Sequence, residues 1–247
     1  MTAGPAVPTR PVVVVPTYNE RDNLPVVVAR LLHHPGLEVL VVDDGSPDGT
    51  GDVADALAAA HPRVHVLHRT GARGLGRSYV DGMRQAMALG ATHVCQMDAD
   101  LSHDPDVVPR LLEQAVAADV VIGSRYVPGG SVSNWAWRRR ALSAFANFYV
   151  RAVTRLQVRD CTSGFRCWSR VALTRLDLEQ IVSDGYAFQV ELTWAAARAG
   201  CRITEWPITF VERRAGSSKM SSAIIIESAL LPWRLAFRRP QGAIQAR

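Results

Sequence analysis

Acidic side chains are concentrated at the ends of three short apolar segments. Those ends read PTYNE at 16–20, DDGSPDGT at 43–50 and DADLSHDP at 98–105. Carboxylates crowded together repel one another unless a cation lies among them. Asp98 and Asp100 are separated by one residue, so an extended turn can point both the same way and bind a hard divalent ion that also holds phosphate oxygens. The alternative is a simple turn, which is the role we assign to Asp48 and Gly49.

Basic side chains offer complementary chemistry in the second half of the chain. Arg125 lies in GSRY, directly after a predicted strand, where a guanidinium can bind a diphosphate. Lys219 is the only lysine among 28 basic residues, and the Gly and Ser residues around it allow a loop to close over phosphate. Retention of one lysine by chance is the alternative. Residues 138–140 are three arginines flanked by Trp135 and Trp137, a pattern typical of a helix end at a membrane interface.

The charge is divided unevenly along the chain. Residues 1–123 carry 9 arginines against 15 acidic residues, a net charge of −6, whereas residues 124–247 have a net charge of +11. This division predicts a first half that binds a cation and a second half that meets anions such as phosphates or a lipid surface. Uneven surface charge without a function is the alternative. We expect no nucleic-acid partner, because the positive charge lies in segments rich in Trp and Phe that match no nucleic-acid-binding motif.

Several function classes lack their sequence signals. The chain has no GxxxxGK[ST] loop and no GxSxG elbow, and after GARGLGR at 71–77 it has Tyr79 where a dinucleotide-binding loop has its third glycine. The four cysteines form no CxxC pair, which favours a reducing environment over a zinc or redox motif. No apolar run approaches the roughly 20 residues that span a bilayer, and the first ten residues contain no signal-peptide core.

The elements that must position these residues follow from apolar periodicity. Strands are predicted at 12–15, 39–42, 64–67, 93–97 and 120–122, and helices at 24–32, 52–60, 75–89 and 106–116. Alternating strands and helices indicate a mostly parallel sheet covered on both faces. Ligands of such sheets bind at the carboxyl ends of the strands, which is where the acidic segments lie.

The pattern changes after residue 126. It predicts a long helix at 135–156, a short irregular strand at 161–168, a helix at 188–199, a strand at 203–211 and an apolar helix at 222–239. We expect a single domain at 11–239 between flexible tails at 1–10 and 240–247, since no linker divides the chain. Within this domain we distinguish a nucleotide- and metal-binding half (11–123), an acceptor half (124–220) and an amphipathic, membrane-proximal helix (221–239).

Taken together, eight segments carry a family resemblance. In order they read PTYNE, VVDDGSPDGT, GLGRSYVDGM, MDADLSHDP, GSRYVPGG, CTSGFRCW, GYAFQVEL and FVERRAGSSKM. Over residues 11 to 239 the chain resembles the polyprenol (dolichyl) phosphate mannose synthases, which are inverting family 2 glycosyltransferases. The resemblance implies the α/β, Rossmann-like glycosyltransferase A fold, with a mostly parallel sheet flanked by helices and a basic C-terminal helical elaboration. It also implies transfer of mannose from GDP-mannose to a polyprenyl phosphate, with inversion.

The resemblance further implies a role for individual residues. The nucleotide sugar would be bound by Pro16, Tyr18, Glu20, Val42, Asp44, Asp98, Ala99, Asp100, Ser102, Arg125, Arg213 and Lys219. A divalent metal, Mg²⁺ or Mn²⁺, would be held by Asp98, Asp100 and Ser102, although some members have Gln at the position of Ser102. Asp100, Arg125, Arg213 and Lys219 would be catalytic, and Arg139 and Ser143 would receive the lipid phosphate.

Two other functions remain open at this point. The residues do not decode the donor sugar, so a UDP-glucose polyprenyl-phosphate glucosyltransferase is the nearer alternative. A non-catalytic membrane-surface scaffold is the more distant one, and it would not require the acidic and basic site residues together. We expect a peripheral protein on the cytoplasmic side of the membrane, held there by its own surface or by a membrane-anchoring partner.

Overall fold

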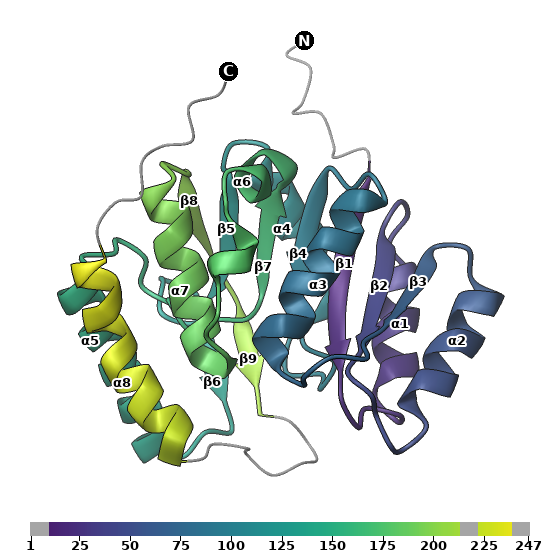
Figure 1. Cartoon of the computed structure of the whole chain (residues 1–247), viewed down its shortest axis with the longest axis horizontal. Helices are drawn as coiled ribbons and strands as arrows, with labels where there is room; N and C mark the ends of the chain where they lie inside the picture. Colours follow the sequence, from purple (N-terminus) through teal and green to yellow (C-terminus); the bar gives the residue numbers. More distant parts are fainter. Residues whose placement is uncertain (1–9, 213–221, 239–247) are drawn as a thin grey trace.

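Seven strands form the central sheet, in the order β3-β2-β1-β4-β7-β5-β8 (Figure 1). Their bounds are β1 (Pro11–Thr17), β2 (Glu38–Asp43), β3 (Val64–His68), β4 (His93–Gln96), β5 (Val120–Ser124), β7 (Arg166–Ser169) and β8 (Ile203–Pro207). The computed structural model describes residues 10–212 and 222–238. β1 pairs in parallel with β2 as far as Thr17 and Asp43, and with β4 as far as Val14 and Gln96. The segments that follow these three strands therefore emerge at one edge of the sheet.

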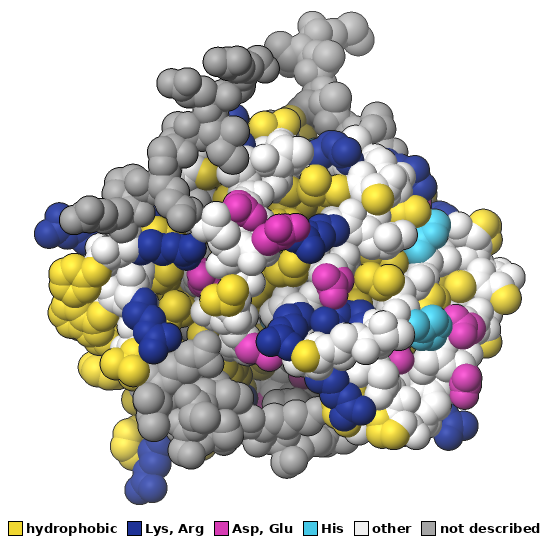
Figure 2. Space-filling view, viewed as in Figure 1, with side chains coloured by type: hydrophobic (Ala, Val, Ile, Leu, Met, Phe, Trp, Pro, Cys, Tyr) yellow, Lys and Arg dark blue, Asp and Glu magenta, His cyan; other side chains and the backbone are white. Residues whose placement is uncertain are grey.

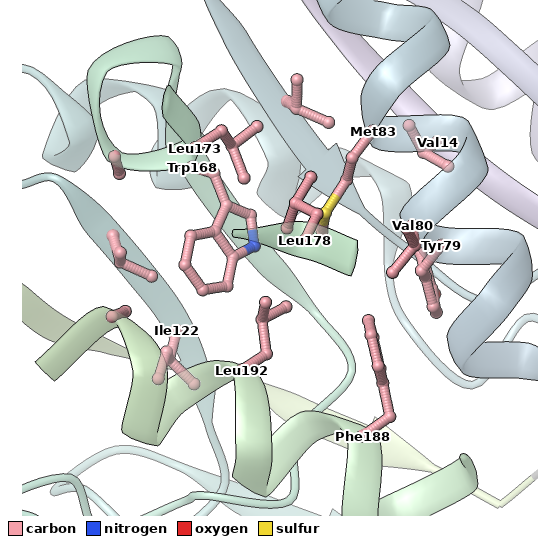
Figure 3. Packing of buried hydrophobic residues seen from close by; sticks show 14 of the residues in the cluster. Val14, Tyr79, Val80, Met83, Ile122, Trp168, Leu173, Leu178, Phe188 and Leu192 are labelled. Carbon is pink, nitrogen blue, oxygen red and sulfur yellow. The ribbon is translucent and has the colours of Figure 1, made fainter. Parts of the chain in front are cut away.

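Helices cover both faces of the sheet. They are α1 (Leu24–Leu32), α2 (Thr50–Ala60), α3 (Leu75–Ala88), α4 (Val108–Ala115), α5 (Trp137–Thr154), α6 (Arg170–Thr174), α7 (Gly185–Arg198) and α8 (Ser222–Phe237), with 3-10 turns η1 (Pro105–Val107) and η2 (Leu178–Gln180). Apolar residues of α1, α2 and α4 pack on one face, and those of α3 and α7 pack on the other, with α5 and α8 beyond α7. Figure 3 shows Trp168 of the sheet, Met83 of α3 and Phe188 of α7 in this second layer.

Most predicted elements are confirmed, and the differences have local causes. The strand expected at 203–211 divides, because Pro207 has no N–H to continue the ladder. Ile208 then bridges two sheets, since its N–H donates to Ser124 O (3.0 Å) and its carbonyl accepts from Ser131 N (2.9 Å). The continuation, β9 (Thr209–Val211), pairs in parallel with β6 (Ser131–Ser133), a strand that the pattern did not predict.

The segment predicted as an irregular strand at 161–168 contributes only its second half to the sheet. Arg166 to Ser169 form β7, which is antiparallel to both β4 and β5. The helix predicted at 188–199 begins earlier, at Gly185, because the Asp184 side chain accepts a hydrogen bond from Gly185 N (2.8 Å) and caps the helix.

The predicted tail is one residue too long at its inner end. Arg10 belongs to the folded domain, where its Nε donates to Glu38 Oε1 (2.8 Å), whereas residues 1–9 and 239–247 lie outside the described residues.

All four cysteines are buried free thiols, and burial raises the pKa of Cys161 to about 12. Within the two described ranges, no helix combines the length and the hydropathy needed to cross a membrane.

A close approach of α3 to the sheet generates the first prediction. A Cβ on Gly82 would collide with the Val14 side chain and lie 2.9 Å from Val42 Cγ2. Such overpacking costs about 1–3 kcal/mol, which exceeds the roughly 1 kcal/mol that alanine gains over glycine in a helix. We expect Gly82→Ala to lower the free energy of unfolding by up to about 2 kcal/mol in urea denaturation. The control is Gly71→Ala, where nothing lies within 4 Å of the added atom; equal stability of the two variants would refute this packing.

Candidate active site

A cavity of about 580 Å³ lies where the strand ends meet the first turns of α3 and α7. Nine residues expected to bind substrate line it, namely Pro16, Tyr18, Glu20, Asp44, Asp98, Ala99, Asp100, Arg125 and Arg139. They come from both halves of the chain, so the cavity is where the acidic and the basic half meet. Acidic and basic side chains also lie close together on the face of the molecule drawn in Figure 2.

Other predicted site residues do not line this cavity. The Val42 side chain is fully buried in the core, and Ser102 is 1% exposed with a hydroxyl that has no hydrogen-bond partner within residues 10–212 and 222–238. Ser143 is not among the lining residues, and its Oγ accepts from the Tyr126 hydroxyl (2.7 Å). Arg213 and Lys219 lie outside the described residues.

The two carboxylates at the end of β4 are held by different donors. Asp98 Oδ1 accepts from the Tyr79 hydroxyl (2.7 Å), and Asp100 Oδ1 accepts from Ser102 N (3.0 Å) across a turn in which Leu101 has a φ of 61°. Burial, together with the charges of Asp98 and Asp100, raises the pKa of Tyr79 well above its usual value, so the phenol remains a donor.

This pair of carboxylates fits a hard divalent ion. The described residues contain no group of three or more His, Cys, Asp or Glu side chains that could hold a metal by themselves. Two carboxylates are sufficient when phosphate oxygens and water complete the coordination, as is usual for Mg²⁺. Asp98 and Asp100 line the same cavity, so they satisfy this requirement, whereas the buried Ser102 is not among the residues that line it.

Arg125 is a buried cation with a dedicated partner. Asp160, which is fully buried, accepts from its Nε (2.8 Å), its Nη2 (2.7 Å) and its backbone N (2.9 Å). Burial alone would lower the pKa of Arg125, but the hydrogen bonds and charge of Asp160 raise it, so the guanidinium stays charged. Its Cζ also lies 5.5–5.7 Å from three aromatic ring centroids, those of Tyr126, Trp135 and Phe210.

Arg139 lies at the exposed side of the same aromatic group. Its Cζ is 4.1 Å from the ring centroid of Trp135, and its Nη1 donates to Glu212 Oε1 (2.5 Å). The side chain is 38% exposed, so this ion pair is open to solvent. Because exposed ion pairs are weak, an incoming phosphate can compete with Glu212 for Arg139. Two guanidiniums thus lie within 6 Å of the Trp135 ring. That of Arg125 is fixed by Asp160, whereas that of Arg139 can exchange Glu212 for another partner.

The sequence interpretation missed several residues at the cavity. Arg73 donates to the Tyr18 hydroxyl (2.7 Å) and lies 4.7 Å from the centroid of its ring. Asp184 joins α3 to α7, because its Oδ1 accepts from Gly76 N (2.7 Å). Gln189 and Asp160 were also missed. Their only signal was their position in or next to the conspicuous segments GYAFQVEL and CTSGFRCW.

Known proteins are similar to this chain in sequence. Residues 12–177 match the family model described as glycosyl transferase family 2. A polyprenol monophosphomannose synthase of Mycolicibacterium smegmatis is 50% identical over 222 residues, which cover 89% of this chain and 84% of the relative. An undecaprenyl-phosphate mannosyltransferase of Micrococcus luteus is 48% identical over 232 residues, which cover 93% of this chain and 96% of the relative.

Solved structures are similar in fold at lower identity. Glucosyl-3-phosphoglycerate synthase from Mycobacterium tuberculosis, in complex with Mn²⁺ and UDP-glucose, has a TM-score of 0.66 at 20% identity and covers 92% of this chain and 79% of its own. A mannosyltransferase from Pyrobaculum calidifontis, in complex with GDP-Man and Mn²⁺, has a TM-score of 0.58 at 20% identity, with coverages of 94% and 74%.

The buried Arg125–Asp160 pair generates the second prediction. Asp160→Asn keeps the shape of the side chain but leaves the buried guanidinium without its counter-charge. Breaking a buried ion pair costs about 3–5 kcal/mol, and we expect a loss at the lower end of this range in chemical denaturation. The control is Glu113→Gln, which removes the solvent-exposed partner of Arg110 and should change stability by less than about 1 kcal/mol. Similar small effects from both changes would contradict the assigned role of Asp160.

Proposed function

Because the chain belongs to glycosyl transferase family 2, we propose that it transfers mannose from GDP-mannose to a polyprenyl phosphate, with inversion. The observation that carries this proposal is a single cavity lined by Asp98 and Asp100 on one side and by Arg125 and Arg139 on the other. Such a cavity suits a reaction with two phosphate-bearing substrates. The names of the two relatives and the GDP-Man complex of the structural neighbour support the choice of sugar and acceptor.

On the donor side, residues from the ends of β1, β2 and β4 bind the nucleoside diphosphate part of the donor. Tyr18 and Asp44 are the contacts we assign to the nucleoside, and Asp98 and Asp100 would hold Mg²⁺ or Mn²⁺. A divalent ion bound there supplies positive charge that stabilises the departing diphosphate. Arg125 adds a further positive charge. Its guanidinium does not have to reorient during the reaction, because Asp160 already holds it in place.

On the acceptor side, the nucleophile needs positioning more than deprotonation. The second pKa of a phosphate monoester is about 6, so the acceptor is largely a dianion at neutral pH. We assign its binding to Arg139, which exchanges Glu212 for the phosphate. A phosphate oxygen then attacks the anomeric carbon opposite the leaving group, a new C–O bond forms, and the bond to GDP breaks with its electron pair staying on GDP. One such displacement converts an α-linked donor into a β-linked product.

The decisive experiment combines labelled GDP-mannose, a polyprenyl phosphate in detergent, and Mg²⁺ or Mn²⁺, and counts label in the organic phase. We expect label that depends on metal and on the lipid phosphate. Asp100→Ala should reduce transfer by at least about 100-fold, the usual scale for loss of a group that stabilises transition-state charge. The control is Asp104→Ala, which removes an acidic residue that lies in the same segment, is 51% exposed and pairs with Arg30.

Each other outcome of this assay has a distinct meaning. Transfer from UDP-glucose in place of GDP-mannose would replace the donor and keep the acceptor. Metal-dependent binding of a sugar nucleotide without transfer would indicate that a component is missing. Binding of neither nucleotide would favour the scaffold, and substantial activity of the Asp100→Ala variant would remove the metal assignment.

We also propose that the face formed by α5 and α8 binds the membrane surface. Exposed apolar residues there include Trp137, Leu142, Phe145 and Phe148 on α5 and Trp233 and Phe237 on α8, each 49–78% exposed. Hydrophobic side chains gather at this edge of the molecule, beside Arg side chains (Figure 2). Apolar and aromatic groups flanked by arginines suit an interfacial position at an anionic bilayer.

The membrane proposal is tested by vesicle sedimentation with anionic phospholipid. Phe145→Glu combined with Phe148→Glu should lower the bound fraction at least about tenfold, because each buried Phe contributes about 1.5–3 kcal/mol. Val171→Glu, at a 55% exposed apolar position on α6, is the control and should bind vesicles like the wild type. Transfer to a water-soluble, short-chain polyprenyl phosphate should be unchanged in the double variant. Undiminished vesicle binding of the double variant would exclude this face.

A further inference from the structure

We propose that Gln189 binds a hydroxyl group of the donor sugar and so contributes to sugar specificity; this inference rests on the proposed sugar-nucleotide donor. Gln189 lies in the second turn of α7 and lines the same cavity as Asp98 and Asp100. Only 3% of the residue is exposed, and its Oε1 has no hydrogen-bond partner among the described residues. Buried polar groups are nearly always hydrogen-bonded, so this one indicates a ligand.

The position of Gln189 along the cavity selects the sugar as that ligand. At the rim, Asp44 follows β2, Tyr18 follows β1 and Asp98 follows β4, and the sheet order continues from β4 to β7. Gly164 lies just before β7, and because this strand is antiparallel, its first residues lie at the same edge. Along this rim, the nucleoside is therefore assigned to the ends of β2 and β1 and the diphosphate to Asp98 after β4. The next position along the rim lies beside Gly164, before β7.

Gln189 occupies that third position. A Cβ on Gly164 would lie 3.5 Å from Gln189 Nε2 and 3.5 Å from Asp98 Oδ2, so the amide and the carboxylate flank one glycine. The sugar of a nucleotide sugar is attached to the diphosphate, so it lies next to the metal-binding carboxylates. A neutral amide suits hydroxyl groups rather than phosphate. Since a hydroxyl both donates and accepts, either orientation of the amide satisfies it.

A second wall residue, His103, also has a buried atom, Nδ1, for which the described part of the chain offers no hydrogen-bond partner. Its ring is packed against Phe165 and Phe210, with centroids 4.9 and 5.2 Å away, and its Nε2 is 3.7 Å from Asp98 Oδ2. This packing makes it a support for the carboxylate. Gln189, by contrast, lies on α7, which a hydrogen bond from Gly76 N to Asp184 connects to α3. A side chain that determines specificity is best positioned when it lies on such a rigid element.

The test compares two ligands that differ only in the sugar. Gln189→Met keeps the length of the side chain and removes its hydrogen bonds. We expect isothermal titration calorimetry with Mg²⁺ to give about tenfold weaker binding of GDP-mannose and unchanged binding of GDP. The control is Thr193→Val on the same helix, which removes a hydrogen bond to the backbone carbonyl of Gln189 (2.7 Å) and leaves its amide intact. This control should bind both ligands like the wild type.

Equal weakening of GDP and GDP-mannose by Gln189→Met would overturn the proposal, as would no weakening of either. If Gln189→Met does not fold, Gln189→Asn provides an independent test. It keeps the polar amide but shortens the side chain by one methylene group, so the amide withdraws from the sugar, and it should reduce GDP-mannose binding selectively. If the wild-type protein binds UDP-glucose but not GDP-mannose, the proposed donor is refuted, but the proposed role of Gln189 is not. Gln189→Met would then be assayed with UDP-glucose against UDP, under the same criterion.

Discussion

The insertion of β7 between β4 and β5 is the constraint on which the cavity depends. This antiparallel strand starts at the edge where β4 and β5 end, so the preceding loop lies between Asp98 and Arg125. Arg166, which is fully buried, holds the loop by donating to the carbonyls of Ser163 (2.8 Å) and Cys161 (2.9 Å). Burial lowers the pKa of Arg166 to about 10, which leaves it charged at neutral pH. The same loop supplies Asp160, the partner of Arg125.

The electrostatics of the cavity follow from this arrangement. The acidic first half supplies the carboxylates Asp98 and Asp100, and the basic second half supplies guanidiniums whose partners differ in strength. Asp160 binds Arg125 in a buried, multiply hydrogen-bonded pair, whereas Glu212 binds Arg139 in an exposed one. Buried pairs hold their geometry and exposed pairs exchange easily. The cavity thus combines a preorganised cation with a replaceable contact, which suits a leaving diphosphate and an arriving phosphate.

The resemblance found in the sequence is confirmed by the family match, and the expected glycosyltransferase A fold is confirmed by the structural neighbours. Periodicity predicted α1 with its observed bounds, because the apolar spacing of 24–32 is that of a helix packed on one face. It failed at β6, a strand of three residues that is too short for alternation to be recognised, and it joined β8 and β9 into one strand. Periodicity also gave no sign that β7 is antiparallel, because a buried strand has the same apolar sequence pattern whether it runs parallel or antiparallel to its neighbours.

The sequence by itself determined strands β1 to β5, the helices between them and the rim where acidic segments meet, because these depend on local periodicity and on residues adjacent to strand ends. Tyr18, Asp98 and Arg125, which the sequence offers as site residues, line this cavity. Only the tertiary structure decided that Asp160 neutralises Arg125, that Ser102 is buried, and that Gln189 lines the cavity. Each of these depends on contacts between segments far apart in the chain, and a single sequence carries no local signal for such contacts.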